Sequence, residues 1–246
     1  MFKKILIISD NPALCKKFHQ IIEKKKFNNS SFSFAISPFS SIHDFNISDE
    51  VLVQTIDLRN QDNIDNIKSN FDLVFSIHCK QIFPSDLVTN VKCINVHPGY
   101  NPINRGWYPQ VFSIINKIAI GATIHEIDEK LDHGAIIARK FVEKDSFDTS
   151  ESLYNKITDL EIELLEEHIE SIIGGTYSTI SPEEEGNLYL KKDFNNLLQL
   201  DLEEKVTVGD FIDKLRALTH GSYDNAYFID QATGKKVFVG IRLKQE

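Results

Sequence analysis

The residues Lys3-Lys4-Ile5-Leu6-Ile7-Ile8-Ser9-Asp10, followed by Asn11-Pro12, set the architecture of this chain. Four consecutive apolar side chains bounded by polar ones are typical of a strand that is buried on both faces of a sheet. Asn11 can cap a helix and Pro12 suits a first helical position, so we predict a helix that runs to about Lys26. A strand that leads directly into a helix is the first half of a parallel α/β unit.

The same alternation continues along the chain. Further apolar runs predict strands at Phe32–Ile36, Val51–Ile56, Asp72–Ile77, Lys92–Val96, Ala119–Ile127 and Ala135–Val142. Helical patterns predict a helix from Trp107 to about Asn116, after a loop at His97–Gly106, and a longer one from a capping-type start within Asp148–Glu151 up to Gly174-Gly175. Strands that alternate with helices predict a Rossmann-like α/β fold with a mostly parallel sheet.

The last quarter of the chain predicts a smaller unit. Thr207 to Asp210 opens a helix over Phe211, Leu215 and Leu218, and Thr233-Gly234 supplies the turn of a hairpin between Ala226–Ile229 and Lys236–Leu243. The acidic run Glu183–Glu185 is predicted to be an exposed link between the two parts of the chain. We therefore predict a domain over residues 1–180 and a helix-plus-hairpin region over residues 187–246.

Composition excludes several classes of protein. The chain has 246 residues, 41% hydrophobic, with 27 Lys and Arg against 36 Asp and Glu, a net charge of −9. An acidic chain repels a phosphate polymer, so we expect no nucleic-acid partner. No apolar window approaches the length of a membrane span, and three cysteines without a C-x-x-C pair favour a reducing compartment, so we expect a cytoplasmic protein.

Polar residues follow several of the predicted strands, where open parallel sheets bind ligands. Ser9-Asp10-Asn11 lacks the glycine pattern of a dinucleotide site, which disfavours a nicotinamide enzyme. His78-Cys79-Lys80 ends one strand, and Asn95 and His97 share a face of another. The histidines show no zinc-binding spacing, and Cys79 and Cys93 have no base partner in sequence, so we expect no metal and no cysteine nucleophile.

Asn95, His97 and Asp132 together suit acyl transfer to an amine. An amide N–H can hold a developing oxyanion, an imidazole can accept the proton of the attacking nitrogen, and a carboxylate can stabilise the imidazolium. From spacing alone, the alternative is structural: Asn95 caps the loop, His97 is a satisfied core imidazole and Asp132 is a turn residue.

Longer motifs around these residues add to this interpretation. Asn95-Val96-His97, Gly121-Ala122-Thr123-Ile124-His125, and Asp128 to Gly134 followed by Ile136-Ile137 resemble the two signatures of the folate-dependent formyltransferases, over about residues 1–176. The loop His97–Gln110 and the segment Arg216–Phe228 resemble the sugar N-formyltransferases that act on dTDP-linked amino-dideoxyhexoses, rather than the transformylases of methionyl-tRNA.

The resemblance implies roles for eight residues. Asn95 would bind the formyl oxygen, His97 would be the general base, and Asp132 would support His97 and proton transfer to the leaving folate nitrogen. Around the substrate, Asn11, His78, Lys80 and Arg105 would approach the hexose and pyrophosphate, and Tyr223 would stack on thymine. Apart from the resemblance, Trp107, the only tryptophan, starts the helix after the loop and is either a pocket wall or core.

The resemblance also implies the reaction and its setting. The donor would be 10-formyltetrahydrofolate, with no metal, and the acceptor a dTDP-amino-dideoxyhexose, with 4-amino-4,6-dideoxyglucose favoured. The same likeness implies a homodimer that uses the C-terminal hairpin. It also implies a place in lipopolysaccharide or O-antigen precursor synthesis. Alternatives are a 3-amino sugar or another amine as acceptor, hydrolysis of the folate, and an inert nucleotide-sugar-binding module.

Overall fold

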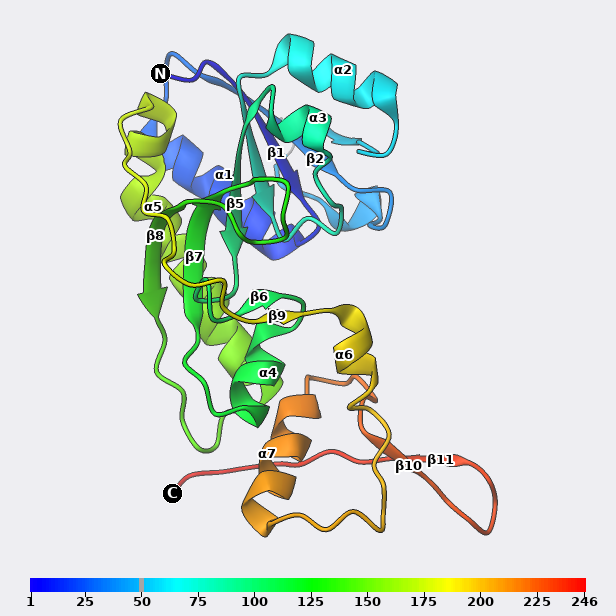
Figure 1. The fold of residues 1–246 in the computed structure, drawn as a ribbon. Helices are drawn as coiled ribbons and strands as arrows, with labels where there is room; N and C mark the ends of the chain where they lie inside the picture. The colour runs from blue at the N-terminus through cyan, green and yellow to red at the C-terminus, as the bar shows by residue number, and fades with distance from the viewer. Residues whose placement is uncertain (49–50) are drawn as a thin grey trace.

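The computed structural model describes residues 1–48 and 51–246, and its centre is a seven-stranded sheet (Figure 1). The strand order is β3-β2-β1-β4-β5-β7-β8. The first five strands are parallel, and β7 and β8 run antiparallel to their neighbours. Their bounds are β1 Lys4–Ser9, β2 Ser31–Ile36, β3 Val53–Thr55, β4 Leu73–Ile77, β5 Lys92–His97, β7 Gly121–Glu126 and β8 Ile136–Phe141. The predicted α/β class with a mostly parallel sheet is confirmed.

Helices cover both faces of this sheet. Their bounds are α1 Pro12–Lys25, η1 Ile42–Asp44, α2 Gln61–Asn70, α3 Ser85–Val88, α4 Pro109–Ile115 and α5 Ser150–Gly174. Ile5 and Ile7 of β1 belong to the core cluster that includes α1 and α5, whereas Leu6 and Ile8 belong to the cluster that includes α2 and α3. The period of two in a strand thus places the first apolar run in both cores. In α1, the Asn11 side chain accepts the Leu14 N–H, as the predicted cap requires.

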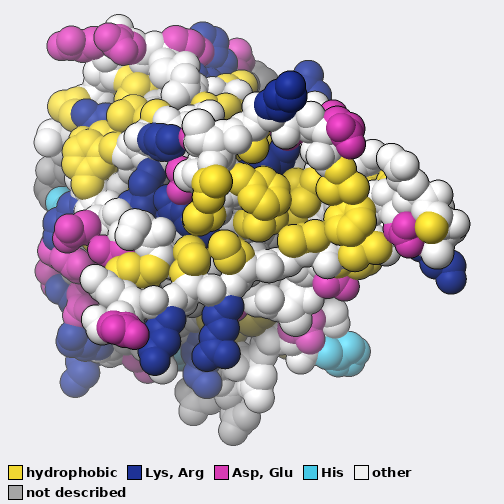
Figure 2. Space-filling model, turned by 90° about the horizontal axis from the view of Figure 1, so that it is seen from below, with side chains coloured by type: hydrophobic (Ala, Val, Ile, Leu, Met, Phe, Trp, Pro, Cys, Tyr) yellow, Lys and Arg dark blue, Asp and Glu magenta, His cyan; other side chains and the backbone are white. Residues whose placement is uncertain are grey.

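The C-terminal region lies beyond one end of the sheet, next to α4 (Figure 1). It contains α6 Lys191–Asn195, α7 Val208–Leu218, and the hairpin of β10 Tyr227–Ile229 and β11 Lys236–Phe238. A space-filling view of this end has a band of hydrophobic side chains that extends toward the protruding hairpin (Figure 2). The predicted helix and hairpin are confirmed, although β11 ends at Phe238 instead of Leu243.

Two local features differ from the prediction. The helix expected from Trp107 begins at Pro109, because Tyr108 takes a left-handed conformation with φ of +53° and Pro109 fixes the first turn. The two-residue strand β6 Arg105–Gly106, inside the expected loop, pairs in parallel with β9 Leu188–Tyr189. No local pattern marks such a short pairing between segments about 80 residues apart.

Across residues 1–48 and 51–246, every helix is too short or too polar to cross a lipid bilayer. The division into residues 1–180 and 187–246 stays a prediction.

Candidate active site

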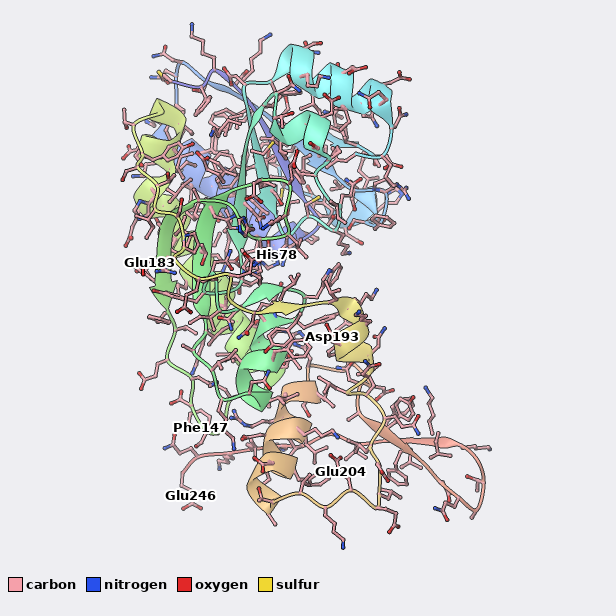
Figure 3. The ribbon with its side chains drawn as sticks, viewed as in Figure 1. His78, Phe147, Glu183, Asp193, Glu204 and Glu246 are labelled. Atoms are coloured by element: carbon pink, nitrogen blue, oxygen red, sulfur yellow. The ribbon has the colours of Figure 1, made fainter. Side chains whose placement is uncertain are left out.

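A cavity of about 820 Å³ opens at the carboxyl ends of β1, β4 and β5. Asp10 and Asn11 follow β1, His78 to Phe83 follow β4, and Asn95 and His97 belong to β5. His78 lies at the end of the sheet that faces α4 and the C-terminal region (Figure 3). The opposite wall comes from α4 and from the segment after α7. The cavity therefore occupies the edge where open parallel sheets bind ligands.

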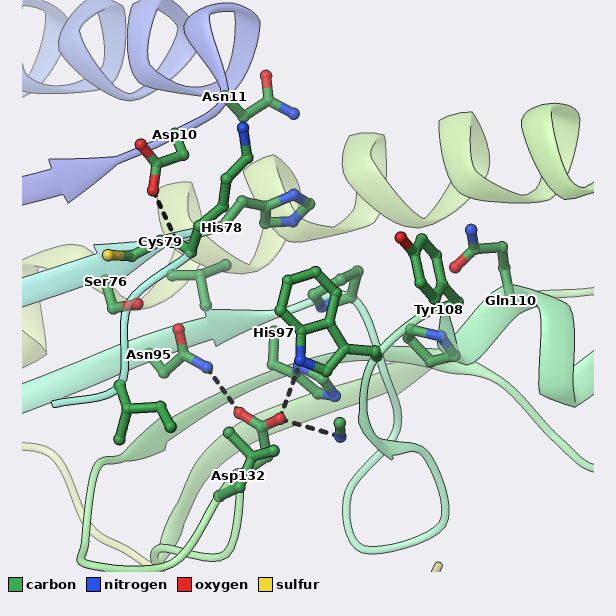
Figure 4. Close-up of a pocket in the computed structure, with 18 of the residues that line it drawn as sticks. Asp10, Asn11, Ser76, His78, Cys79, Asn95, His97, Tyr108, Gln110 and Asp132 are labelled. Carbon is green, nitrogen blue, oxygen red and sulfur yellow. Dashed lines mark hydrogen bonds and ion pairs between the residues drawn. The ribbon is translucent and has the colours of Figure 1, made fainter. Parts of the chain in front are cut away.

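Asp132 is the centre of a cluster of polar side chains in this cavity (Figure 4). Its Oδ1 accepts a hydrogen bond from Asn95 Nδ2 at 3.0 Å, and its Oδ2 accepts one from the Gly106 N–H at 3.0 Å. His97 Nδ1 lies 3.7 Å from Oδ2, and His125 Nε2 lies 3.6 Å from Oδ1. The three residues expected to be catalytic are thus neighbours in space, although Asp132 is far from the other two in sequence.

The two histidines of this cluster have defined tautomers. His97 Nε2 lies 2.8 Å from the Asn104 carbonyl oxygen, and since a carbonyl only accepts, this nitrogen carries the proton. The lone pair of neutral His97 is therefore on Nδ1, facing Asp132. His125 Nδ1 likewise donates to the Glu126 carbonyl at 2.7 Å, which leaves Nε2 as an acceptor for Asn95 Nδ2 at 3.2 Å.

The carboxyl of Asp132 is held in its ionised form. Burial alone would raise its pKa, but the nearby charges of His97 and His125 in their protonated forms and the hydrogen bond from the Gly106 N–H lower it. The net result is a pKa well below the ordinary value for an aspartate. A fixed negative charge beside His97 Nδ1 stabilises that ring once it has accepted a proton.

The side-chain amide of Asn95 already donates to two partners, whereas its expected role requires a hydrogen for the formyl oxygen. Both hydrogens of its side-chain amide have acceptors, one on Asp132 and the other on His125. To hold a formyl oxygen, this amide must exchange one of these hydrogen bonds. The bond to His125 is the longer of the two and leaves a neutral nitrogen behind, so it costs less to give up.

The other expected site residues of β1 and β4 form a second network. His78 Nε2 pairs with the fully buried carboxylate of Glu161 at 2.8 Å, and His78 Nδ1 lies 3.1 Å from the Tyr154 hydroxyl. Asn11 Nδ2 donates to the same hydroxyl at 3.0 Å. Lys80 is exposed at the cavity edge, where its N–H donates to the buried Asp10.

Trp107 and Tyr223 line the cavity, whereas Arg105 does not. Of the two positions left open for Trp107, the structure therefore places it in the pocket wall. The Tyr223 side chain is 73% exposed at the cavity mouth. Arg105 is 3% exposed and binds Glu185 and the Leu131 carbonyl, so the expectation that it approaches the hexose and pyrophosphate does not match its surroundings. Among the described lining residues, the lysines Lys80 and Lys130 are the permanent cations.

Three site residues were not singled out from the sequence, although each carried some signal. In β7, His125 lies on the same strand face as Thr123. Side chains two positions apart point to the same side of a strand, so this placement could be predicted from the sequence. Glu161 lies four residues after Ile157 and four before Leu165, on the buried stripe of α5, where a carboxylate needs a partner. His220 follows α7, and its Nδ1 lies 3.1 Å from the Ser150 hydroxyl.

The cysteines near the site are unsuited to nucleophilic chemistry. Burial raises the pKa of Cys79 and of Cys93 to about 12, so both thiols stay protonated near neutral pH. Among the residues that the structure describes, no group of three or more His, Cys, Asp or Glu side chains is arranged to hold a metal ion. The reaction without a metal stays a prediction.

Two family models match this chain. The family described as "Formyl transferase" matches residues 3–169, and the one described as "N-formyltransferase dimerization C-terminal domain" matches residues 193–245. A dTDP-4-amino-4,6-dideoxyglucose formyltransferase of Mycobacterium tuberculosis is 54% identical over 180 residues, 73% of this chain and 76% of the relative.

Two solved structures are similar over nearly the full length. A 4-N formyltransferase from Francisella tularensis is 42% identical, with a TM-score of 0.93 and coverage of 99% of both chains. A sugar N-formyltransferase from a Shewanella species is 37% identical, with the same TM-score and coverage. The first family match covers more than half of this chain and includes Asn95, His97 and Asp132. The chain therefore belongs to the formyl transferase family.

Proposed function

We propose that this protein transfers a formyl group from 10-formyltetrahydrofolate to the amino group of dTDP-4-amino-4,6-dideoxyglucose. The observation that carries the proposal is the cluster in which Asp132 contacts Asn95 and faces Nδ1 of His97 within a cavity of about 820 Å³. The names of the 54% identical relative and of the 42% identical solved structure support a 4-amino sugar as the acceptor.

The cavity fits a folate donor on chemical grounds. Ile82, Phe83, Ile127 and Leu131 line the cavity that contains Asn95 and Asp132, and the side chains of Ile82 and Leu131 are exposed. Exposed apolar side chains beside convergent polar groups suit a flat heteroaromatic ring. The bound donor supplies an activated formyl carbon on a nitrogen leaving group.

In the proposed reaction, the residues of the chain move protons and stabilise charge. His97 Nδ1 accepts a proton from the acceptor nitrogen as that nitrogen bonds to the formyl carbon. Asn95 Nδ2 donates to the formyl oxygen, where negative charge develops. His97 then releases the proton to the departing folate nitrogen, and the Asp132 carboxylate stabilises the imidazolium between the two transfers.

The other end of the cavity suits a nucleotide. We assign Tyr223 to stacking on the thymine ring because its exposed side chain offers a free aromatic face at the mouth. Lys80 is the cation that we assign to the pyrophosphate. Asn11 and His78, which share the Tyr154 hydroxyl, are assigned to the hexose.

A homodimer is part of the proposal. The match of residues 193–245 to a dimerization domain supports it, as does the hydrophobic band at this end of the molecule (Figure 2). Val208, Phe211 and Phe238 are exposed large apolar residues of the C-terminal region, and a second copy would cover them. Light scattering of the full chain at tens of micromolar should give twice the monomer mass, and a monomer would refute the dimer.

The reaction is assigned to the cytoplasm, in the synthesis of a cell-surface glycan precursor such as O-antigen.

The decisive experiment is mass spectrometry of a panel of 3-amino and 4-amino dTDP sugars incubated with enzyme and 10-formyltetrahydrofolate. We expect a formyl mass increment, fastest on dTDP-4-amino-4,6-dideoxyglucose, and consumption of folate only when the sugar is present. Consumption without sugar would indicate a hydrolase, binding without turnover an inert module, and a preference for a 3-amino sugar would overturn the choice of acceptor. Asp132→Asn serves as the inactive control.

A further inference from the structure

Arg105 has the surroundings of a structural clamp. Its side chain is almost fully buried, and it lies outside the cavity. Nε donates to the Leu131 carbonyl at 3.1 Å, and Nη1 donates to the main-chain carbonyl of Glu185 at 2.7 Å and to its carboxylate at 3.0 Å. These two nitrogens thus have acceptors within the protein, and the guanidinium charge has a carboxylate partner.

The Leu131 carbonyl directly precedes Asp132, whose backbone has a left-handed φ of +46°. This conformation is costly for a residue with a side chain, and it persists only where the surroundings impose it. Three hydrogen bonds do so: Arg105 binds the carbonyl before Asp132, Asn101 Nδ2 binds the Asp132 carbonyl at 2.9 Å, and the Gly106 N–H binds its carboxylate. Arg105 therefore helps to fix the turn that presents the carboxylate.

Glu185 belongs to the segment that leads to the C-terminal region, residues 183–189, which we call the connector. The connector is pressed against the loop that contains Arg105. A Cβ atom on Gly186 would lie 1.9 Å from the Pro102 carbonyl oxygen, and one on Gly106 would lie 2.1 Å from the Tyr189 carbonyl oxygen. Backbone hydrogen bonds from Arg105 to Asn187 and from Asn187 to Pro102 complete the contact.

We propose that Arg105 is a positioning residue for formyl transfer. Arg105 ties the connector to the Asp132 turn, and the connector thereby holds the Asp132 carboxylate beside His97. The inference rests on the function proposed above. It gives Arg105 a different role from the contact with the hexose and pyrophosphate that the sequence resemblance implies. A displacement of about 1 Å in a catalytic group lowers a rate by about 100-fold, so loosening of this clamp has a measurable effect.

The test compares Arg105→Met and Arg105→Lys in the full chain. Methionine keeps the apolar stem and removes every donor, so we expect kcat to fall about 100-fold while the dissociation constant of dTDP, measured by calorimetry, changes less than about twofold. Lysine has one ammonium group that cannot hold Leu131 and Glu185 in the geometry of the guanidinium, so its loss should be intermediate. If Arg105→Met does not fold, kcat and the dissociation constant of dTDP are measured for Arg105→Lys instead.

Hydrogen–deuterium exchange gives a readout that needs no turnover. The Gly106 amide is bonded to Asp132 Oδ2, so its deuterium uptake reports directly on the position of that carboxylate. We expect faster uptake at Gly106 in Arg105→Met, approaching the rate in Asp132→Ala, which removes the acceptor of this amide. Glu185→Ala should change kcat less than about threefold, because the main-chain carbonyl of residue 185 still accepts from Nη1.

Arg216→Met is the matched control. Arg216 is also buried, and it also donates to two carbonyls, those of Asp145 and Asp148, and to one carboxylate, that of Asp213. Its loss should lower thermal stability by a similar amount but leave kcat at saturating substrate and the uptake at Gly106 within about threefold of wild type.

The outcomes separate the possible roles of Arg105. A weaker dTDP affinity with unchanged kcat in Arg105→Met would identify a pyrophosphate ligand and overturn the proposal. Lower stability alone, with kcat and Gly106 uptake as in Arg216→Met, would reduce Arg105 to a structural residue and also overturn it. If the wild-type protein formylates no dTDP-amino sugar, the proposed function fails, whereas uptake at Gly106 still decides whether Arg105 holds the Asp132 turn.

Discussion

His97 Nδ1 faces Asp132 Oδ2 across 3.7 Å. This separation is too long for a hydrogen bond, but it is short enough for strong attraction once the ring is charged. Because the opposite ring nitrogen donates to the Asn104 carbonyl, the neutral ring has its lone pair on the side of the carboxylate. The carboxylate thus lies beside the one ring nitrogen of His97 that can accept a proton.

Replacement of His97 by Asn should lower kcat by roughly 10²- to 10⁴-fold, because the acceptor nitrogen then loses its general base. In the wild-type enzyme, kcat/KM should fall at acid pH, because a protonated imidazole can no longer act as a base. Steady-state kinetics and dTDP calorimetry check both points, since the nucleotide should still bind to His97→Asn. A variant with near-wild-type kcat would exclude His97 as the base.

Asp132→Asn should damage turnover more than binding, because it keeps the size of the side chain and removes the charge that stabilises imidazolium. The same variant should change the acid stability. The pKa of this carboxyl is depressed in the folded state, so its stabilising contribution is complete above about pH 4 and is lost as the pH falls further.

Urea unfolding from pH 6 down to pH 3 should therefore show that the difference in unfolding free energy between wild type and Asp132→Asn shrinks with falling pH. A raised KM with unchanged kcat would instead show that Asp132 only binds substrate.

Tyr223→Ala should weaken dTDP binding by about 1–3 kcal/mol, the range measured for stacking of a base on an aromatic side chain. The residue is exposed, so the free energy of unfolding should change little. Tyr223→Phe is the control, because it keeps the ring and loses only the hydroxyl, and its affinity should stay close to wild type. Equal affinities in calorimetry for wild type and Tyr223→Ala would remove Tyr223 from the nucleotide site.

Glu161→Gln should lower the free energy of unfolding by about 1–3 kcal/mol, because it replaces the buried carboxylate that holds His78 with a neutral amide. Loss of this anchor should also raise KM for the dTDP sugar more than it lowers kcat, since His78 is assigned to the hexose. Glu163→Gln makes the same change on the exposed face of α5 and should be nearly neutral in urea unfolding. Equal stabilities for the two variants would contradict a structural role for the His78–Glu161 pair.

Patterns that depend on near neighbours in the chain were predictable. The apolar run Ile5–Ile8 and the Asn11 cap determine β1 and α1, because strand burial and helix capping involve residues a few positions apart. The same locality places Asn95 and His97 on one face of β5. The order of the strands and the position of Asp132 next to that face required the family resemblance or the structure.

The sequence by itself thus determined the alternation of strands and helices, the long helix α5 and the family motifs around the active site. Only the tertiary structure decided which groups each polar side chain meets. Arg105 was expected to approach phosphates, because a guanidinium suits them equally well, yet it binds Glu185, 80 positions away, and the turn of Asp132. His78 and Glu161 come from β4 and α5 and meet only once these elements pack together. Partner choice among charged groups depends on distance and burial in the folded chain, and neither is encoded in a local pattern.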